Sequence, residues 1–453
     1  MKDYITIIGG GLAGSEAAYQ ISKAGIKVKL YEMKPIKYSA AHSNTNLAEI
    51  VCSNSFKSNL HTNACGLLKE ELRLLDSLLI KIADKTAIPA GQALAVDREI
   101  FSKIITEELE KNEKIEIVRK EVTNIEEMIR DGIVIIATGP LTSDGLSKEI
   151  IKITGKDRLA FYDAAAPIVE KDSIDFNIAF YGNRYDQERG KEEDINDWQK
   201  RIKNQEKSYI NLPMNKEEYE NFYNELISAE VAQLHDFEKK EIFEGCMPIE
   251  VMAKRGLDTL RFGPLKPVGF TDLRTGKRPY AIVQLRQDNE EGTIYNIVGF
   301  QTNLKFGEQK RVFSMIPGLK NAEFSKYGVM HRNTFINSPK LLNETYQVNK
   351  IQNLYFAGQI TGVEGYVESI SSGLVAALNA IENYKSSENK IIFPKYTMIG
   401  ALSNYVCAEN DNFQPMNANF GILPELEEKI KDKKLKYTKL ADKSIEKITE
   451  MLQ

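Results

Sequence analysis

The chain has 453 residues, a net charge of −4 and 42% hydrophobic residues, which is typical of a soluble globular protein with two or three domains. No apolar run approaches the length of a membrane span, and we expect no signal peptide because the N-terminus leads directly into a strand. The acidic charge argues against a protein that coats nucleic acid non-specifically, but it leaves room for a local basic patch. Four scattered cysteines and four histidines show no zinc-binding spacing, so we expect no metal and a reducing, cytoplasmic location.

The first predicted elements form a βαβ unit. Residues 3–8 have the pattern of a buried strand, residues 12–24 that of a helix, and residues 26–31 that of a second strand. Further helices are predicted at 66–83 and 97–111, the latter capped by the Asp-Arg pair at its start.

A strand–turn–helix pattern occurs again late in the chain. The β-branched strand at 132–141 ends in a glycine turn, and a similar pattern returns at 353–382. We therefore predict an α/β fold in which a two-part FAD-binding Rossmann-like domain is interrupted by an inserted α+β domain. The predicted boundaries are 1–160 and 340–453 for the two parts, with the inserted, substrate-facing domain at 161–339.

Two stretches are rich in charged residues. Thirteen of the 22 residues at 186–207 are charged, which favours a solvated helix or loop over core. Residues 428–448 form a lysine-rich amphipathic helix, for which a solvated face is favoured over an RNA contact.

The glycine loop after the first strand predicts a dinucleotide site. Gly9, Gly11 and Gly14 match GxGxxG: the first permits the turn, the second lets the backbone approach a pyrophosphate, and the third allows close packing. The helix N-terminus then faces the phosphates. Glu32 ends the second strand, where it is placed to bind a ribose hydroxyl.

The later glycine turns favour FAD over NAD as the bound cofactor. ATGP at 137–140 and the segment at 356–373 fit two-part FAD folds, in which a helix N-terminus stabilises negative charge on the reduced ring. No second GxGxxG is found, so NADH or NADPH is expected as a transient reductant. The predicted cofactor-binding residues are Gly9, Gly10, Gly11, Leu12, Ala13, Gly14, Glu32, Lys34, Gly139, Gly358, Gln359 and Gly365.

Two cysteines are candidates for chemistry. Cys52 and Cys246 lie among polar and glycine-rich residues, although a buried inert thiol is the ordinary alternative. Cys65 and Cys407 are interpreted as packing residues. Three cations follow Cys246 and would favour its thiolate if the fold brings them near: Lys254, Arg255 and Arg261.

Long blocks between residue 9 and about residue 369 resemble one family. They include GGGLAGSEAA, YEMKP, AEIVCSNS, FEGCMPIEVMAKRG, YGVMHRNTFINSP and FAGQITGVEGYVES. These blocks are similar to those of the bacterial folate- and FAD-dependent RNA uracil-C5 methyltransferases, which methylate a uracil in the T-loop of tRNA.

The resemblance implies a thiol-dependent reaction on uracil. A thiolate that adds to C6 makes C5 nucleophilic, methylenetetrahydrofolate supplies the carbon, and reduced FAD delivers a hydride. By the motif match, Cys246 is the attacking thiol and Cys52 the second functional thiol, acting in proton transfer or in protecting the adduct.

The resemblance also implies residues that bind the substrates. His331 and Arg332 would meet the folate, although a loop histidine in an ordinary hydrogen bond is the alternative. Arg286 and Lys305 would hold folate or phosphates, with surface salt bridges as the alternative reading.

Other functions stay open at this point. The charged stretch at 186–207 looks inserted relative to the family, and relatives in reduced genomes methylate a uracil of large-subunit ribosomal RNA, so rRNA is the alternative target. A flavin oxidoreductase for a small molecule and a non-catalytic RNA-binding protein are the alternatives of other classes. The oligomeric state stays open as well.

Overall fold

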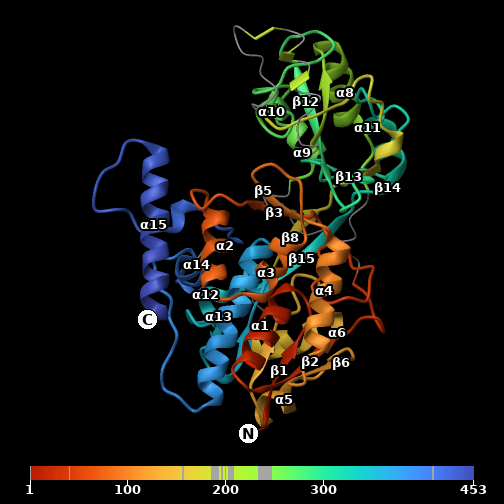
Figure 1. Ribbon diagram of the computed structural model, residues 1–453. Coiled ribbons are helices and arrows are strands. Elements are labelled where there is room, and N and C mark those ends of the chain that lie inside the picture. Colours follow the sequence, from red (N-terminus) through yellow and green to blue (C-terminus); the bar gives the residue numbers. More distant parts are fainter. Residues whose placement is uncertain are drawn as a thin grey trace.

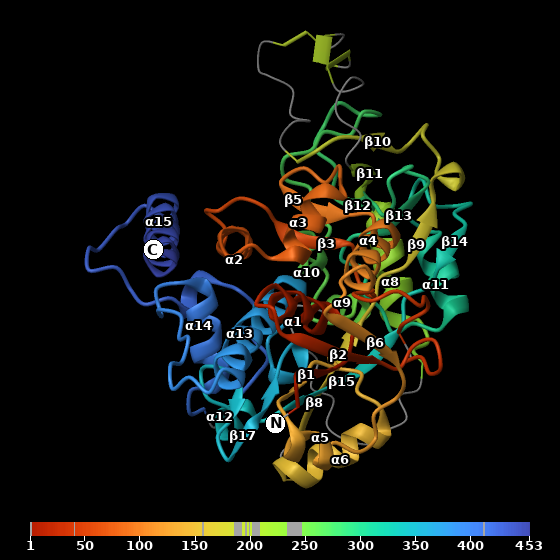
Figure 2. The same ribbon diagram turned by 60° about the horizontal axis from the view of Figure 1, so that its bottom comes forward.

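The computed structural model describes residues 2–39, 41–155, 158–184, 193–194, 197–198, 200–201, 209–232, 247–410 and 413–453. These residues form two bodies, each with its own hydrophobic core. The first core draws on residues 5–150 and 335–448, and the second on residues 166–322. Figure 1 shows both termini in the first body, with the second body above it, and Figure 2 shows the two bodies from a second direction.

A six-stranded sheet lies at the centre of the first body. β1 pairs in parallel with β2 and β7, and β7 pairs in parallel with β17. Strands from the two ends of the chain thus lie side by side, which confirms the predicted α/β fold assembled from both ends. In spatial order the strands are β16 (Gln347–Val348), β17 (Ile351–Phe356), β7 (Val134–Ile136), β1 (Tyr4–Ile8), β2 (Lys27–Glu32) and β6 (Ile115–Arg119).

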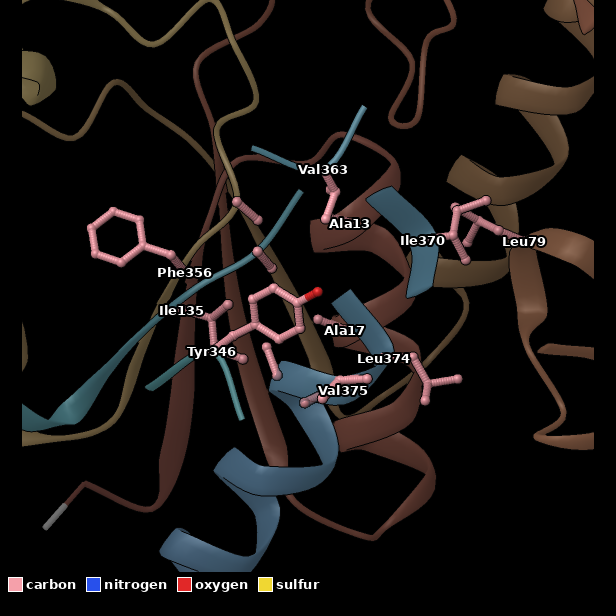
Figure 3. Packing of buried hydrophobic residues seen from close by; sticks show 14 of the residues in the cluster. Ala13, Ala17, Leu79, Ile135, Tyr346, Phe356, Val363, Ile370, Leu374 and Val375 are labelled. Atoms are coloured by element: carbon pink, nitrogen blue, oxygen red, sulfur yellow. The ribbon is translucent and has the colours of Figure 1, made fainter. Parts of the chain in front are cut away.

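Two helices that follow glycine turns pack closely against each other. They are α1 (Leu12–Lys23) and α13 (Tyr366–Tyr384), and Figure 3 shows the small side chains of α1 facing apolar residues of α13. A Cβ atom at Gly373 would lie 2.3 Å from the carbonyl oxygen of Ala13, so only glycine permits this approach. The packing fixes the two glycine turns relative to each other.

The single helix predicted at 66–83 is wrong. The structure has two helices there, α2 (Ala64–Leu74) and α3 (Leu78–Lys85). Asp76 adopts left-handed backbone with φ of 56°, and the Ser77 side chain caps the first turn of α3. Each of the two helices buries an apolar face, so apolar residues recur at helical spacing on both sides of the break. The hydrophobic pattern therefore does not reveal that one helix ends and a second begins at the Ser77 cap.

Helix α4 (Arg98–Glu110) begins as predicted. The Asp97 carboxylate accepts hydrogen bonds from the amides of Glu99 and Ile100 at 3.0 and 2.9 Å, so the predicted cap is confirmed. The other elements of the first body are β3 (Ser55–Ser58), β4 (Ala87–Ile88), β5 (Ala93–Val96), α5 (Glu126–Asp131), α6 (Asp144–Thr154), α12 (Ser338–Leu341), α14 (Met398–Cys407), α15 (Lys433–Leu452) and the 3-10 turns Gln359–Thr361 and Phe420–Ile422.

The second body is an antiparallel sheet with helices packed on it. The chain enters it through β8 (Arg158–Ala164) and leaves it through β15 (Met330–Ile336), which pair with each other. The predicted domain boundaries fall within β8 and α12. The sheet order is β10 (Phe180–Tyr181), β11 (Tyr209–Met214), β12 (Ala281–Gln287), β13 (Ile294–Ile297), β9 (Ile168–Glu170) and β14 (Phe324–Lys326). The helices are α8 (Lys216–Ser228), α9 (Ile249–Ala253), α10 (Thr259–Phe262), α11 (Phe306–Phe313) and the 3-10 turn Lys171–Ser173.

The structure can be compared with the predictions for the two charged stretches, 186–207 and 428–448. Most of 186–207 lies outside the described residues, but Trp198 within it is 1% exposed, so this part of the stretch belongs to a core. Helix α15 buries Leu440, Ala441 and Ile448 against α2, as its amphipathic pattern predicts. Among the described helices, none is long and apolar enough to cross a membrane.

A buried carboxylate ties three helices of the first body together. Glu71 of α2 accepts the amides of Met398 and Ile399 in the first turn of α14 at 2.6 and 2.8 Å, and the hydroxyl of Ser444 in α15. Burial raises the pKa of Glu71 from 4.5 to about 7. An unfolded chain therefore loses this proton at a lower pH than the folded chain does.

We expect this carboxyl to make the protein less stable as pH rises from 5 to 7. Over that interval the folded state retains a proton that the unfolded state has released, so the free energy of unfolding falls by up to about 3 kcal/mol. Denaturant unfolding of Glu71→Gln should show a flatter pH dependence than the parent protein. Glu446→Gln, an exposed change on α15, is the control, and equal pH slopes for Glu71→Gln and the parent would contradict the assignment.

Candidate functional site

A cavity opens at the carboxyl ends of four strands of the first sheet. It lies between the glycine loop after β1, the end of β2, the turn after β7 and the turn after β17. Ligands bind at this position in open α/β sheets, and we call it the dinucleotide cavity. Ten of the predicted cofactor residues line it: Gly9, Gly10, Gly11, Leu12, Ala13, Glu32, Lys34, Gly139, Gly358 and Gln359.

The other two predicted glycines, Gly14 and Gly365, are not among the residues that line the cavity. A Cβ atom at Gly14 would lie 1.9 Å from the carbonyl oxygen of Gly9, and one at Gly365 would lie 2.1 Å from the Glu368 carboxylate. The local packing therefore requires both glycines, and their contact with the cofactor stays a prediction. Gly365 has φ of 130° and precedes the first turn of α13.

The N-terminus of α1 is suited to a phosphate. Its N-cap is Gly11, and no side chain among the described residues caps it. A Cβ atom at Gly11 would meet no atom within 4 Å, so the loop presents open backbone to the cavity. Uncapped helix amides together with the helix dipole favour an anion at this point.

Glu32 holds the glycine loop and faces the same cavity. Its Oε2 atom accepts the Gly10 amide at 3.0 Å, and its Oε1 atom accepts the Lys34 amide at 2.9 Å. Each carboxylate oxygen has a second lone pair, so these bonds leave acceptor capacity for a ribose hydroxyl. The prediction for Glu32 stays a prediction, but its position at the end of β2 fits it.

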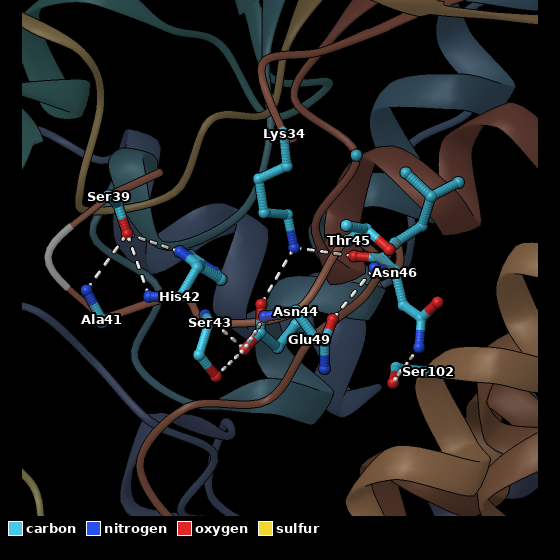
Figure 4. A network of polar contacts seen from close by, with 12 residues as sticks. Lys34, Ser39, Ala41, His42, Ser43, Asn44, Thr45, Asn46, Glu49 and Ser102 are labelled. Carbon is cyan, nitrogen blue, oxygen red and sulfur yellow. Dashed lines mark hydrogen bonds and ion pairs between the residues drawn. The ribbon is translucent and has the colours of Figure 1, made fainter. Parts of the chain in front are cut away.

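Lys34 has a structural partner in the cavity wall. Its ammonium lies 3.0 Å from Glu49 and donates to the Asn46 carbonyl at 2.7 Å (Figure 4). Burial would raise the pKa of Glu49, but hydrogen bonds from Ser43 and Lys34 hold this pKa below its usual range. Burial, and then the charge of Lys34, lower the pKa of His42 beside them, so this wall presents a neutral imidazole.

Tyr366 connects the dinucleotide cavity to Cys52. The ring lines the cavity at the start of α13, and its hydroxyl accepts the amides of Cys52 and Ser53, both at 3.1 Å. Burial raises the pKa of Tyr366, so the group is a neutral phenol. The Tyr366 side chain thus contacts both the cavity and the loop that carries Cys52. Cys52 itself is half-buried.

Arg286 clamps the Cys52 loop from the second body. From β12 its guanidinium donates to Asn54 Oδ1 at 2.9 Å and to the Ser53 hydroxyl. Asn54 in turn donates to the carbonyls of Val96 and Gln287 at 3.1 and 2.9 Å. The guanidinium of Arg286 is therefore buried and hydrogen-bonded to this loop. Its predicted contact with folate or phosphate stays a prediction.

A second cationic group lies close to the same loop. Arg98 is paired with Asp288 at 2.6 Å, yet Arg98 Nε and Asp288 Oδ2 are buried without a hydrogen-bond partner among the described residues. Burial, and then the charge of Arg98, lower the pKa of Lys326, which also interacts with Cys52. Two cations therefore act on the surroundings of this thiol.

The remaining predicted residues are less informative. Cys246 lies outside the described residues. For His331 and Arg332 only the backbone is described, in β15 opposite β8. Lys305 forms an exposed ion pair with Glu230 at 2.5 Å, which matches the alternative of a surface salt bridge. Cys65 is buried, and burial raises its pKa to about 11, as expected of a packing residue.

Sequence reasoning missed Tyr366, Arg98 and Lys326 as parts of the site. Tyr366 directly follows the glycine turn that was predicted to meet the flavin, so its place at a helix start was a usable signal. Arg98 was interpreted only as part of a helix cap. Lys326 carried no signal, because its closeness to Cys52 comes from the packing of the two bodies.

The fold and the cavity define the class: an α/β protein with a two-part dinucleotide-binding domain of the flavoprotein kind. The family profile described as "Glucose inhibited division protein A" matches residues 4–388. Two solved structures of GidA from Aquifex aeolicus are similar over 99% and 100% of this chain and 75% and 78% of theirs. Their TM-scores are 0.66 and 0.67 at 17% and 16% identity, which establishes likeness of fold.

Relatives of similar length give the family more narrowly. A protein of Acetivibrio thermocellus named methylenetetrahydrofolate--tRNA-(uracil-5-)-methyltransferase TrmFO is 59% identical over 96% of this chain and 95% of its own. Proteins of the same name from Staphylococcus saprophyticus and Enterococcus faecalis are 55% and 54% identical, over 98% and 100% of this chain and 98% and 99% of theirs. The chain belongs to the TrmFO family.

Proposed function

We propose that this protein methylates C5 of a uracil in tRNA, with methylenetetrahydrofolate as carbon donor and FAD as bound cofactor. The observation that carries the proposal is identity of 53–59% over nearly the whole chain to relatives whose name states this reaction. The joining of a dinucleotide cavity to a thiol loop through Tyr366 supports it.

The residues of the dinucleotide cavity fit FAD. The uncapped amides of α1 would hold the pyrophosphate, Gly11 leaves room for it, and Glu32 would accept from a ribose hydroxyl. The turn at Gly358 and the start of α13 would lie against the flavin. When bound in its reduced form, FAD supplies the hydride that completes the methyl group. NADH or NADPH then returns the oxidised FAD to its reduced form.

A cysteine thiolate would activate the uracil ring for methylation. The Cys246 thiolate would form a bond to C6, which moves electron density to C5. C5 would then bond to the carbon donated by methylenetetrahydrofolate. Removal of the C5 proton by a base would expel tetrahydrofolate and leave an exocyclic methylene. Addition of a hydride to this methylene would form the methyl group and break the sulfur–C6 bond, which releases the thiolate. We assign Cys246 this role from the family motif.

Cys52 would act beside it as the second thiol, in proton transfer or in protecting the adduct. Tyr366 and Arg286 would fix the backbone on both sides of it. The charges of Arg98 and Lys326 would favour its anionic form. His331 and Arg332 stay proposals for the folate contact.

Labelled methylenetetrahydrofolate tests the proposal directly. Purified protein should be yellow and should transfer the labelled carbon to uracil in tRNA only when NADH or NADPH is present. Mass mapping of 5-methyluridine in a deletion strain, with and without the restored gene, should place the product in tRNA. If 5-methyluridine appeared only in ribosomal RNA, the substrate would be ribosomal RNA rather than tRNA. Unmodified RNA together with rapid, folate-independent NADH oxidation would favour a small-molecule oxidoreductase.

A further inference from the structure

The most basic part of the second body is residues 254–278, which we call the basic segment. It contains seven Lys or Arg residues and two Asp residues, in a chain whose net charge is −4. Arg261 and Arg274 pair with the two aspartates, Asp258 and Asp272. Seven basic residues against two acidic ones give this segment a positive charge by sequence, although the chain as a whole is acidic.

Three lysines of this segment are available to a polyanion. Lys254, Lys266 and Lys277 are exposed, and within the described part of the chain no carboxylate lies within 4 Å of their ammonium groups. In α15, by comparison, two lysines, Lys439 and Lys447, pair with Glu428 and Glu450 at 2.7 and 2.6 Å. The three lysines of the basic segment are therefore candidates for phosphate contacts.

An aromatic ring stands out of the same segment. Phe262, at the end of α10, is 81% exposed, the largest value among the exposed large hydrophobic residues of the described chain. Its neighbour Arg261 donates to the Tyr280 carbonyl at 2.9 Å and lies 3.6 Å from the Tyr280 ring centre. The backbone that carries Phe262 is therefore held in place while its ring faces solvent.

The basic segment is attached firmly to the strand that holds the Cys52 loop. The Ile282 amide of β12 donates to the Leu265 carbonyl at 3.1 Å, and Arg286 of β12 binds Ser53 and Asn54. Four residues of strand separate these two contacts, which is about 13 Å, or a few nucleotides of RNA.

We propose that the basic segment is the surface on which the RNA substrate docks, with Phe262 as a stacking platform for an unpaired base beside the target uracil. Lys254, Lys266 and Lys277 contact the phosphates of the same strand. An exposed ring among cations suits single-stranded nucleotides, because every base has a face to stack on and every nucleotide a phosphate. This inference rests on the proposed function and names the part of the chain that recognises its substrate.

Two variants of the full-length, FAD-loaded protein test the docking surface. Phe262→Ala should weaken tRNA binding about tenfold with an unchanged salt dependence, and Phe262→Tyr should restore it. The triple change Lys254→Ala, Lys266→Ala and Lys277→Ala should weaken binding and lower the slope of log affinity against log salt by about two to three units. FAD content and NADH oxidation should stay at the parent level in both.

A matched triple change provides the control. Lys429, Lys431 and Lys434 are exposed lysines at and before the start of α15, and their change to alanine removes the same charge. Unchanged tRNA affinity in the basic-segment variants, or an equal loss in the control, would overturn the docking surface. If the parent protein itself modified no RNA, the proposed function would fail, which is a separate result.

Discussion

The Cys246→Ala variant is expected to lose methyl transfer to RNA while it retains its FAD. Without a thiolate to add to C6, C5 of uracil is too weak a nucleophile to attack the donated carbon. The dinucleotide cavity is lined by residues within 8–146 and 358–369, so we expect a change at residue 246 to leave it intact. We expect transfer of labelled carbon to fall by about 10³-fold or more, measured beside the flavin absorption spectrum.

An RNA that carries 5-fluorouracil at the target position identifies the nucleophile. Fluorine at C5 cannot leave as a proton, so the sulfur–C6 adduct accumulates and survives denaturing electrophoresis. The Cys52→Ala variant should still form this adduct, and Cys246→Ala should not. Cys407→Ala is the control, since burial raises the pKa of that thiol and its sulfur contacts the Asn343 carbonyl at 2.8 Å. A denaturation-resistant complex with Cys246→Ala would refute the assignment.

The second large effect is expected from Gly11→Ala. A Cβ atom here meets no protein atom within 4 Å, and the backbone φ of −74° is accessible to alanine, so the fold should be unaffected. The methyl group would occupy the space in which the backbone must approach a pyrophosphate. We expect the affinity for FAD to fall by about tenfold or more, seen as a lower flavin-to-protein ratio after purification.

Gly307→Ala is the matched control for this change. Gly307 lies in α11 of the second body, and a Cβ atom there also meets no atom within 4 Å. Alanine in a helix stabilises by up to about 1 kcal/mol relative to glycine, so this variant should keep its FAD and unfold no earlier. Full FAD content in Gly11→Ala would show that the cofactor does not use the N-terminus of α1.

The two variants separate the two halves of the proposed site. Gly11→Ala lowers the FAD content and, in proportion, every flavin-dependent reaction, including NADH oxidation. Cys246→Ala leaves NADH oxidation in place and removes only the chemistry on RNA. A Cys246→Ala variant that also lost NADH oxidation would have a damaged fold rather than a damaged site, which circular dichroism would reveal.

Local sequence patterns determined the glycine loop, the strand before it and the acidic residue after the second strand. These features lie within one βαβ unit, in which Gly14 packs against the Gly9 carbonyl and Glu32 accepts the Gly10 amide. The cap at Asp97 was equally local. The break at Asp76 was missed because a left-handed residue inside a periodic apolar stretch changes no hydrophobic pattern.

The sequence by itself determined the nucleotide-binding fold and, through long family motifs, the candidate thiols and the reaction. Only the tertiary structure decided that Tyr366 holds the Cys52 loop and that Arg286 reaches it from the second body, contacts that span 314 and 233 residues of chain. It also decided that Phe262 faces solvent. The physical reason is that such contacts depend on how two separately folded cores pack, and no local periodicity or spacing encodes that packing.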